Sequence, residues 1–475
     1  MPTRNLLVIT LTAIIAMVCY TKAQRNRYAA GITEAMQIID AKYVEEVDIR
    51  DLYENAMDGL VDGLDQYSSY ISPSDYQKFQ ESIDQKFGGI GIHVELNETT
   101  KRLTILGPLL NTPAFEAGLK PGDTILSIDG SDTAGLDLRD AVKLMRGDPG
   151  EIVKLVLRRY GETDTRTFEI PRAIIPVESV HGDRRLDDGR WEFKLREDPR
   201  ICYIRLTTFG EESVRELKNA MVGADRKQPP PEALILDIRD NAGGLLRAAV
   251  ETCDMFLRSG AIVSTRGRKK NDSYSATTKT VIPMSVPIVV LVNHESASAS
   301  EIVSACLQDH ERAIVIGDRT WGKGTVQNII SLDNGKSALK LTTASYWRPS
   351  NKNIHRHKDA TNEDDWGVKP NEGFALKLTD EQRRAMQLDR RAREIYFGDN
   401  QPPPKPATES PKAPATDSAS EGKSSPDDET STQTPETKAA TDDEPNVAVE
   451  SLQLTLEDLQ LKLAIEHLQK RLDNK

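Results

Sequence analysis

Two stretches of the sequence share one layout: an apolar run leads into a turn of small residues, and a helical pattern follows. In the first stretch, the run Leu234–Leu236 precedes the glycine pair Gly243-Gly244. In the second, the run Pro287–Val292 precedes Ser296–Ser300, which reads Ser-Ala-Ser-Ala-Ser. Short continuous apolar runs are typical of strands buried on both faces, and their alternation with helices is typical of a parallel α/β sheet. We therefore expect an α/β core.

The same alternation continues from Ile174 to about Gly398. Apolar runs bounded by turn residues predict strands, and longer stretches with helical periodicity predict helices. The expected strands are residues 201–206, 233–238, 261–265, 287–292 and 313–317, and the expected helices are residues 213–221, 245–257 and 300–309.

The serine run stands where a strand is expected to turn into a helix. A serine hydroxyl becomes a good nucleophile only when a nearby base takes its proton, and a lysine serves as that base if burial keeps its amine neutral. Lys323, in the sequence Trp-Gly-Lys-Gly-Thr, is a candidate for such a base. The alternative is that the serines only cap a helix, because serine is a preferred N-cap residue.

The glycine pair Gly243-Gly244 ends the turn after the first apolar run. Glycines let backbone N–H groups face a site without side-chain obstruction, and N–H groups of this kind stabilise a developing oxyanion. A plain turn is the simpler interpretation of these two residues alone.

A separate module lies at about residues 85–172. It contains the glycine-rich lead Phe87–Val94, the stretch Ala117–Asp123 (Ala-Gly-Leu-Lys-Pro-Gly-Asp) and an expected strand at Ile152–Leu157. This order of motifs closely resembles a PDZ domain. The resemblance implies that an extended peptide is bound as an added strand, with its terminal carboxylate held by backbone N–H groups. The residues expected to receive an apolar C-terminal tail are Gly89, Ile90, Gly91 and Ile92.

Taken together, these motifs resemble the C-terminal processing (tail-specific) serine peptidases that carry a PDZ domain. The resemblance implies a ClpP/crotonase-like α/β peptidase core and a Ser/Lys catalytic dyad. It implies that Ser298 is the nucleophile, Lys323 its base and Gln327 an accessory catalytic residue. It also implies that Gly244 and Ala299 donate the oxyanion-hole N–H groups.

Two segments depart from the pattern of that family. Residues 64–68 read Leu-Asp-Gln-Tyr-Ser where the family more often has Leu-Asp-Pro-His-Ser, and residues 366–371 read Trp-Gly-Val-Lys-Pro-Asn where it more often has Gly-Ile-x-Pro-Asp. We expect neither departure to touch the catalytic positions. His294 lies near the serine run, but a histidine four residues ahead of Ser298 in one turn has poor geometry for a general base.

The ends of the chain differ from its middle. An apolar stretch from Leu6 to Tyr20 after Arg4 indicates a secretory signal or an uncleaved membrane anchor, so we expect a periplasmic or envelope location outside the cytoplasm. Residues 401–446 contain no large apolar side chain and are rich in Pro, Ser, Thr and acidic residues, which predicts disorder. A stretch with two apolar stripes follows, and we expect it to form a docking or dimerising helix, with simple core packing almost as good an interpretation.

The expected fold class is therefore an α/β multidomain protein with a helical N-terminal segment, a PDZ domain, a peptidase core and a disordered tail. On one face of the N-terminal helical segment we expect Ile32, Ala35, Met36, Ile39 and Tyr43. The expected segments are 1–24 (signal peptide or membrane anchor), 26–83 (N-terminal helical region), 85–172 (PDZ domain), 174–398 (peptidase core), 399–447 (disordered linker) and 448–475 (C-terminal helix).

Composition limits the possible partners. The 62 basic and 74 acidic residues give a formal net charge of −12 without a concentrated basic stripe, which argues against a nucleic-acid partner. The four widely spaced cysteines imply neither a disulfide framework nor a metal site, and the pair His355 and His357 fits a solvated turn better than a metal site. We expect no metal ion or other cofactor.

Three functions fit these observations. The leading one is a serine endopeptidase that recognises the C-terminal tail of protein or peptide substrates, with membrane anchorage and a homodimer as possible additions. The second is a catalytically silent PDZ scaffold, which has no physical need for Ser298, Lys323 and Gln327 together. The third is an acyl-transfer or hydratase-type enzyme, against which the PDZ module argues because small substrates need no strand-binding groove.

Overall fold

The structure is a computed structural model that describes residues 5, 9–17, 27–97, 100–186, 189–223, 229–278, 280–394 and 458–474. The expected linker 399–447 lies outside the described residues, and so does part of the expected signal or anchor segment. Residues 9–17 are helical and exposed. Within the described part of the chain, no helix combines the length and the apolar content needed to cross a membrane.

A five-stranded sheet forms the centre of the peptidase core, in the order β10-β13-β14-β17-β18. Four strands run parallel: β13 (Ile201–Leu206), β14 (Ala233–Asp237), β17 (Ile288–Val292) and β18 (Ile314–Gly317). The short edge strand β10 (Val180–His181) pairs antiparallel with β13. Three helices lie between the parallel strands in the sequence: α7 (Ser213–Val222), α8 (Leu246–Asp254) and α9 (Ala299–Asp309). The strands and helices expected for the core are confirmed to within a few residues.

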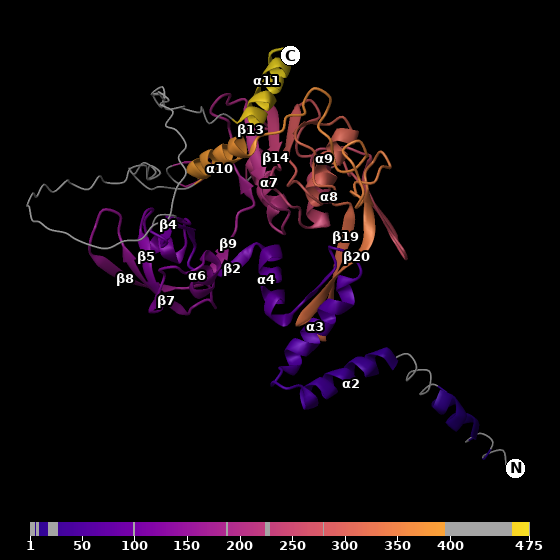
Figure 1. Cartoon of the computed structure of the whole chain (residues 1–475). Coiled ribbons are helices and arrows are strands. Elements are labelled where there is room, and N and C mark those ends of the chain that lie inside the picture. Colours follow the sequence, from indigo (N-terminus) through magenta and orange to yellow (C-terminus); the bar gives the residue numbers. More distant parts are fainter. Residues whose placement is uncertain are drawn as a thin grey trace, which may run out of the picture.

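The central sheet is covered on both faces, as parallel sheets usually are. Because side chains alternate along a strand, Leu234 and Leu236 of β14 pack with the apolar cluster that includes α7, α8 and α9. Ala233 and Ile235 pack with a second cluster that contains Leu461, Ala464 and Leu468 of α11 (Leu459–Asp473). The C-terminal helix therefore docks on the core of its own chain (Figure 1).

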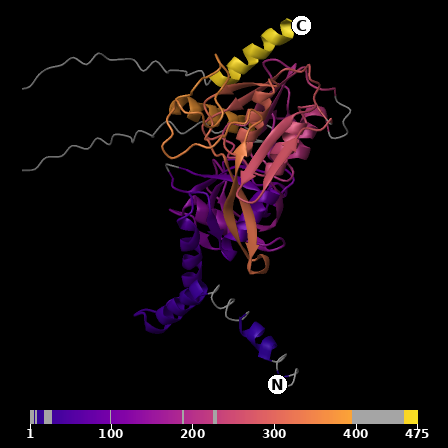
Figure 2. The same ribbon diagram turned by 90° about the vertical axis from the view of Figure 1, so that its right-hand side faces the viewer.

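A second sheet lies beside the core and was not expected from the sequence, apart from β15. It has the order β1-β20-β15-β16, with β19 also paired to β20. Its strands are β1 (Ser69–Ile71), β15 (Ala261–Gly267), β16 (Asn271–Ser275), β19 (Thr325–Leu332) and β20 (Ser337–Trp347), and the short 3-10 turn Asp333–Gly335 joins the last two. The long hairpin β19–β20 projects from the core (Figure 2). Strand β1 pairs with it and so ties the N-terminal region to the core.

The PDZ module folds around its own sheet in the order β3-β4-β5-β7-β8, with β6 paired to β5. Its elements are β3 (Ile92–Leu96), β4 (Leu103–Pro108), α5 (Pro113–Glu116), β5 (Thr124–Ile128), β6 (Ser131–Asp132), α6 (Leu138–Met145), β7 (Ile152–Arg158) and β8 (Thr165–Pro171). The chain enters through β2 (Lys86–Gly89) and leaves through β9 (Ala173–Pro176), and these two strands pair with each other. The expected strand at residues 152–157 is confirmed.

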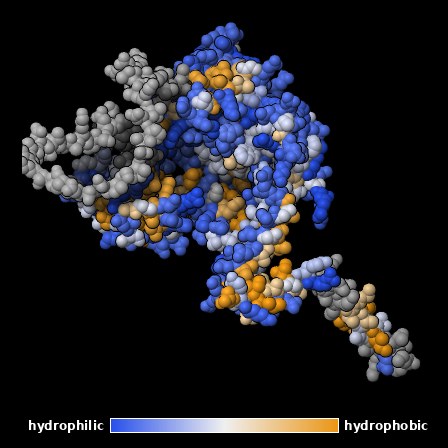
Figure 3. Space-filling view, in the orientation of Figure 1, coloured by the Kyte–Doolittle hydropathy of each residue, from blue (hydrophilic) through white to orange (hydrophobic). Residues whose placement is uncertain are grey.

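The N-terminal region is helical, as expected. It contains α2 (Arg27–Lys42), α3 (Ile49–Asp62) and α4 (Pro73–Asp84). The expected apolar stripe on α2 exists but is not buried, since Ile32 is 40% exposed and Tyr43 is 58% exposed. Figure 3 shows apolar side chains at the surface of these helices. The periodicity correctly predicted a helix, but nothing in the described chain covers its apolar face.

The remaining elements connect these parts. They are β11 (Arg184–Arg185), β12 (Trp191–Glu192) and α10 (Asp380–Glu394). Arg391 of α10 pairs with Glu95 of β3 in the PDZ module at 3.0 Å. The helix α10 therefore contacts both the peptidase core and the PDZ module.

Candidate active site

Ser298 lies at the N-terminus of α9, directly after the turn that follows β17. We call residues 293–298 the serine turn. Ser298 is buried, and its φ of 56° is rare for a residue with a side chain. Such strain is tolerated only where the surroundings fix the backbone. The candidate nucleophile therefore sits on a tight strand-to-helix turn, as the sequence predicts.

A single buried carboxylate holds this turn. Glu301, one turn into α9, accepts a hydrogen bond from the Ser298 N–H and another from the Lys323 N–H, both at 2.8 Å and both on Oε2. Its Oε1 accepts from the Gly322 N–H at 2.7 Å and from the Thr320 hydroxyl at 2.6 Å. Burial raises the pKa of Glu301, and these four hydrogen bonds oppose that effect. The backbones of the two candidate catalytic residues thus contact the same oxygen atom.

Lys323 belongs to the segment 320–324, which we call the lysine loop, and its side chain is half-buried. Burial lowers the pKa of the Lys323 amine, the nearby charge of Lys340 lowers it further, and Glu301 opposes both effects. The amine is therefore neutral more often than that of an exposed lysine. It lies 5.3 Å from the centre of the Tyr67 ring.

The side chains of Ser298 and Lys323 are not hydrogen-bonded to each other in the described structure. The Ser298 side chain lies close to the phenol of Tyr346 on β20, and its proximity lowers the pKa of Tyr346. Burial is the larger effect and raises the pKa of Tyr346 to about 12.

The glycine turn, residues 240–244, lies against Ser298. A side chain on Gly243 would come within 2.8 Å of both the Ala297 carbonyl oxygen and the Ser298 Cβ, and one on Gly244 would meet the Phe209 carbonyl at 2.3 Å. Only glycine fits both places. Among the described residues, the N–H groups of Gly244 and Ala299 have no hydrogen-bond acceptor. They are therefore free to donate to a ligand.

The serine turn and the glycine turn are joined directly. Ser300 donates from its hydroxyl to the Asn241 carbonyl at 2.8 Å, and the Ala297 N–H donates to the same carbonyl at 3.0 Å. The Ser296 hydroxyl donates to the Ile238 carbonyl at 2.8 Å. Ser296 and Ser300 are thus structural ties between the two turns. Ser298 is itself the N-cap residue of α9. The candidate nucleophile and the helix-capping serine, which the sequence offered as alternatives, are therefore the same residue.

Gln327 lies on β19 and contacts neither Ser298 nor Lys323 through any hydrogen bond of the described structure. Its amide donates to the Thr342 hydroxyl at 3.1 Å, and that hydroxyl donates to the Asp65 carboxylate at 3.0 Å. The amide also donates to Thr325 Oγ1 at 2.9 Å. Gln327 therefore connects the site to the N-terminal region.

The expectation that the divergent segments stay away from the catalytic positions is wrong for residues 64–68. Tyr67 lies over the Lys323 amine, and Asp65 holds Thr342, the partner of Gln327. In the other segment, a side chain on Gly367 would come within 3.4 Å of Glu301 Oε1. The pairing of β1 with β20 brings residues 65–68 back to the site, a long-range contact that local sequence does not reveal.

His294 does not act on Ser298 in this arrangement. The Nε2 atom of His294 contacts Arg383 of α10 and Glu295, which excludes a Ser298–His294 pair in this geometry. His355 and His357 meet edge to face with ring centres 5.2 Å apart. Among the described residues there is no group of three or more potential metal ligands.

The expected tail-binding residues form the turn between β2 and β3. The Ile90 side chain is buried in the PDZ core, and Gly91 has a φ of +79°. A side chain on Gly91 would meet Thr112 at 2.5 Å. Proline cannot adopt this φ, so a Gly91→Pro variant would distort the turn as well as remove an N–H group. A test of tail recognition should therefore change the substrate rather than this glycine.

Comparison with known proteins agrees with this architecture. Residues 200–372 match the model of peptidase family S41, residues 104–159 match that of the PDZ domain, and residues 17–74 match that of the N-terminal domain of the activating protease CtpB. A carboxy-terminal-processing protease of Bartonella bacilliformis is 38% identical over 347 residues, covering 72% of this chain and 76% of the relative. The chain belongs to the carboxy-terminal-processing peptidases of family S41.

Other relatives of this peptidase have similar names. The carboxy-terminal processing protease CtpB of Bacillus subtilis is 32% identical over 350 residues, covering 73% of this chain and 69% of the relative. A solved structure of a photosystem II D1 C-terminal processing protease covers 77% of this chain and 98% of that chain, with 25% identity and a TM-score of 0.40.

Three contributors to the peptidase site were missed in the sequence: Glu301, Tyr67 and Tyr346. Glu301 could have been found, because Ser298 and Glu301 form the Ser-x-x-Glu pattern of a capping box. Tyr67 and Tyr346 reach the site through strand pairing between distant segments, and no local pattern marks them.

We expect a Glu301→Gln substitution to lower both stability and activity. An amide cannot accept hydrogen bonds on its nitrogen, so two of the four donors lose their acceptor, at about 1–3 kcal/mol for each buried group left unpaired. Thermal unfolding and peptide cleavage measure the two effects. The control is Glu295→Gln, in the same turn but half-exposed. If both variants behave alike, Glu301 does not hold the site together.

Proposed function

We propose that this peptidase is a serine endopeptidase with a Ser298/Lys323 dyad, and that it acts outside the cytoplasm on proteins selected by their C-terminal tails. The observation that supports it most directly is the shared Glu301 carboxylate, which joins the backbones of Ser298 and Lys323. Because the Glu301 carboxylate fixes the backbones of Ser298 and Lys323 next to each other, it would hold their side chains in position to act together.

In the proposed reaction, the neutral amine of Lys323 takes the proton of the Ser298 hydroxyl as the oxygen attacks a peptide carbonyl. The N–H groups of Gly244 and Ala299 stabilise the oxyanion that forms. The Lys323 ammonium then gives its proton to the leaving amine, and an acyl-enzyme remains. In the second half, Lys323 takes a proton from the water that attacks the ester, and it returns that proton to the Ser298 oxygen as the ester bond breaks.

Gln327 has a supporting role in this proposal. Through Thr342 and Asp65 it links β19, the strand that follows the lysine loop, to the N-terminal region. The free-donor state of Gly244 and Ala299 and the lowered pKa of Lys323 both support the assigned roles.

Substrate choice is assigned to the PDZ module. Gly89, Ile90, Gly91 and Ile92 would receive the terminal carboxylate through backbone N–H groups, and an apolar pocket would take the last side chain. The named relatives are carboxy-terminal-processing proteases, which fits a substrate chosen by its tail. The apolar N-terminal stretch supports export or anchorage.

We expect Ser298→Ala to abolish cleavage while thermal stability stays near that of the wild type. The backbone bonds of this residue to Glu301 remain, and only the reacting hydroxyl is lost. Ser296→Ala is the contrasting variant: its hydroxyl is not needed for the reaction, but loss of the buried bond to the Ile238 carbonyl predicts lower stability, with cleavage retained at low temperature. Lys323→Arg should be inactive, because arginine stays protonated.

Unfolded substrate protein with an apolar C-terminus serves as the assay for these variants. Near-native cleavage by Ser298→Ala or Lys323→Arg would refute the dyad. Loss of cleavage in Ser296→Ala alone, at a temperature where it is folded, would move the nucleophile to that residue.

We also expect the enzyme to cleave a substrate that ends in a free carboxylate faster than the same substrate with an amidated C-terminus. Amidation removes the charge that the N–H groups of the PDZ turn would bind. Cleavage rates of the paired substrates measure the effect, with an internal peptide that lacks the tail as control. Equal rates for both forms would show that the PDZ module does not select the tail.

A further inference from the structure

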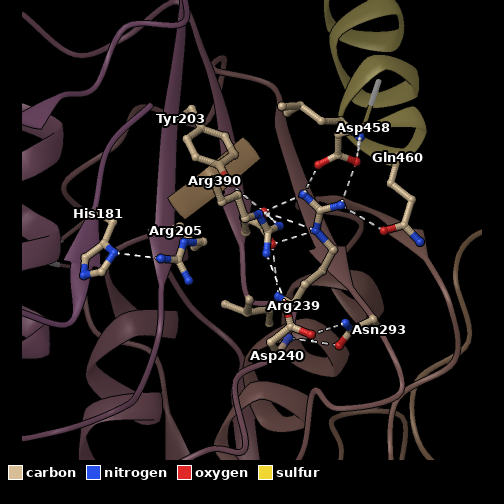
Figure 4. Close-up of polar contacts among 12 residues, drawn as sticks. His181, Tyr203, Arg205, Arg239, Asp240, Asn293, Arg390, Asp458 and Gln460 are labelled. Atoms are coloured by element: carbon tan, nitrogen blue, oxygen red, sulfur yellow. Dashed lines mark hydrogen bonds and ion pairs between the residues drawn. The ribbon is translucent and has the colours of Figure 1, made fainter. Parts of the chain in front are cut away.

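The C-terminal helix reaches a buried ionic cluster under the catalytic turns. Arg239, at the end of β14, donates to both carboxylate oxygens of Asp237 and to both carboxylate oxygens of Asp458, at 2.7–3.2 Å. Gln460 accepts from the same guanidinium at 2.9 Å. Figure 4 shows Arg239 extended toward Asp458 and Gln460. Two of the partners of this buried arginine therefore come from the last helix of the chain.

The cluster is balanced in charge. Arg390 of α10 donates to Asp237 at 2.6 Å, so two arginines face Asp237 and Asp458. Arg390 also reaches Asp240 at 3.2 Å. The side chains of Arg239 and Asp237 are fully buried. A buried charge that loses its partner is strongly unfavourable, so the cluster is complete only while Asp458 stays in place.

Arg239 is also the residue just before the glycine turn. Asp240 follows it, and the N–H of Asp240 donates to Asn293 Oδ1 at 3.0 Å while Asn293 donates back to the Asp240 carboxylate at 2.7 Å. This pair joins the start of the glycine turn to the start of the serine turn (Figure 4). A shift of the Arg239 backbone therefore moves the N–H of Gly244 relative to Ser298.

Outside this cluster, α11 covers one face of the central sheet and is tied at its far end by the pair of Asp473 with Arg200. Leu461, Ala464 and Leu468 pack on the sheet. A hollow of about 560 Å³ lies beside α11, between this helix, α10 and the core, and residues that include Ile465 and Lys462 line it. Residues 395–457 separate the two helices in the sequence. Because α11 contributes no strand to the central sheet, its displacement would break no strand pairing.

We propose that α11 is a docking clamp for the catalytic site: Asp458 and Gln460 are positioning residues that complete the buried partners of Arg239 and so fix the glycine turn beside Ser298. Undocking of α11 slows catalysis although the sheet stays folded. The role in catalysis rests on the proposed function, whereas the role in holding the turn does not.

The test is an Asp458→Asn substitution in the full chain. Asparagine is as good an N-cap as aspartate, so the start of α11 is kept, while the charge opposite Arg239 and one of the two acceptor oxygens for its guanidinium are lost. The matched control is Asp473→Asn, which removes the same charge from the same helix but at an exposed pair with Arg200. Gln460→Ala is a milder second variant, and Asp458→Glu restores the charge.

Two readouts are needed. The first is the kcat and KM of cleavage: we expect kcat of Asp458→Asn to fall about ten- to a hundredfold with KM nearly unchanged, since misplaced oxyanion donors cost rates of that order. Gln460→Ala should show a smaller fall and Asp458→Glu a partial recovery. The second is hydrogen exchange of the backbone amides of residues 239–245, which should become faster in Asp458→Asn and stay unchanged in Asp473→Asn.

These outcomes separate the two claims. If the amide exchange of residues 239–245 and kcat are the same in Asp458→Asn, Gln460→Ala and Asp473→Asn, the clamp is refuted while Ser298-dependent cleavage stands. If wild-type cleavage does not depend on Ser298, the proposed function fails. The clamp is then judged by hydrogen exchange only: faster exchange of residues 239–245 in Asp458→Asn and Gln460→Ala supports it. A general loss of protection across the central sheet in both variants would make α11 an ordinary part of the core and overturn the clamp.

Discussion

The buried carboxylate of Glu301 is the contact through which the serine turn and the lysine loop meet. It accepts four hydrogen bonds, and two of them come from the backbone N–H groups of Ser298 and Lys323. A carboxylate in this position has all of its acceptor sites directed at donors of two separate segments. Burial makes each bond strong and makes the loss of any one costly. The relative position of the proposed nucleophile and base therefore depends on one side chain.

The parallel sheet makes this arrangement possible. Strands β14 and β17 are neighbours in parallel register, so the turns at their carboxyl ends emerge side by side. One turn carries Gly244 and the other carries Ser298, and the Asn241 carbonyl ties them together. The second sheet brings in the rest of the site, since β19 and β20 follow the lysine loop and β1 adds the N-terminal region. Helix α11 supports the glycine turn from the opposite face of the sheet through Arg239.

The sequence predicts the buried half of this architecture well. Strands β13, β14 and β17 are continuous apolar runs, and such runs have few other interpretations in a chain of alternating strands and helices. The hairpin β19–β20 was missed because its strands mix Thr, Ser, Asn and Lys with apolar residues and are mostly only partly buried. Local patterns pointed to the serine run and to Lys323, and the family resemblance singled out Ser298. Tyr67 was missed because strand pairing across more than 250 residues of sequence brings it to the site. Tyr346 was missed because it lies on β20, which the sequence did not predict.

The central claim is that Lys323 acts as a neutral base whose pKa is lowered by burial and by the charge of Lys340. The direct measurement is the rate of Ser298 acylation by an activated p-nitrophenyl ester as a function of pH, in the wild type and in Lys340→Gln. Since only the neutral amine accepts a proton, the rate should rise with pH through the pKa of Lys323, below that of an exposed lysine. Removal of the Lys340 charge raises that pKa, so the rise should move to higher pH. A rise that does not move, or an acylation rate independent of pH, would contradict the account.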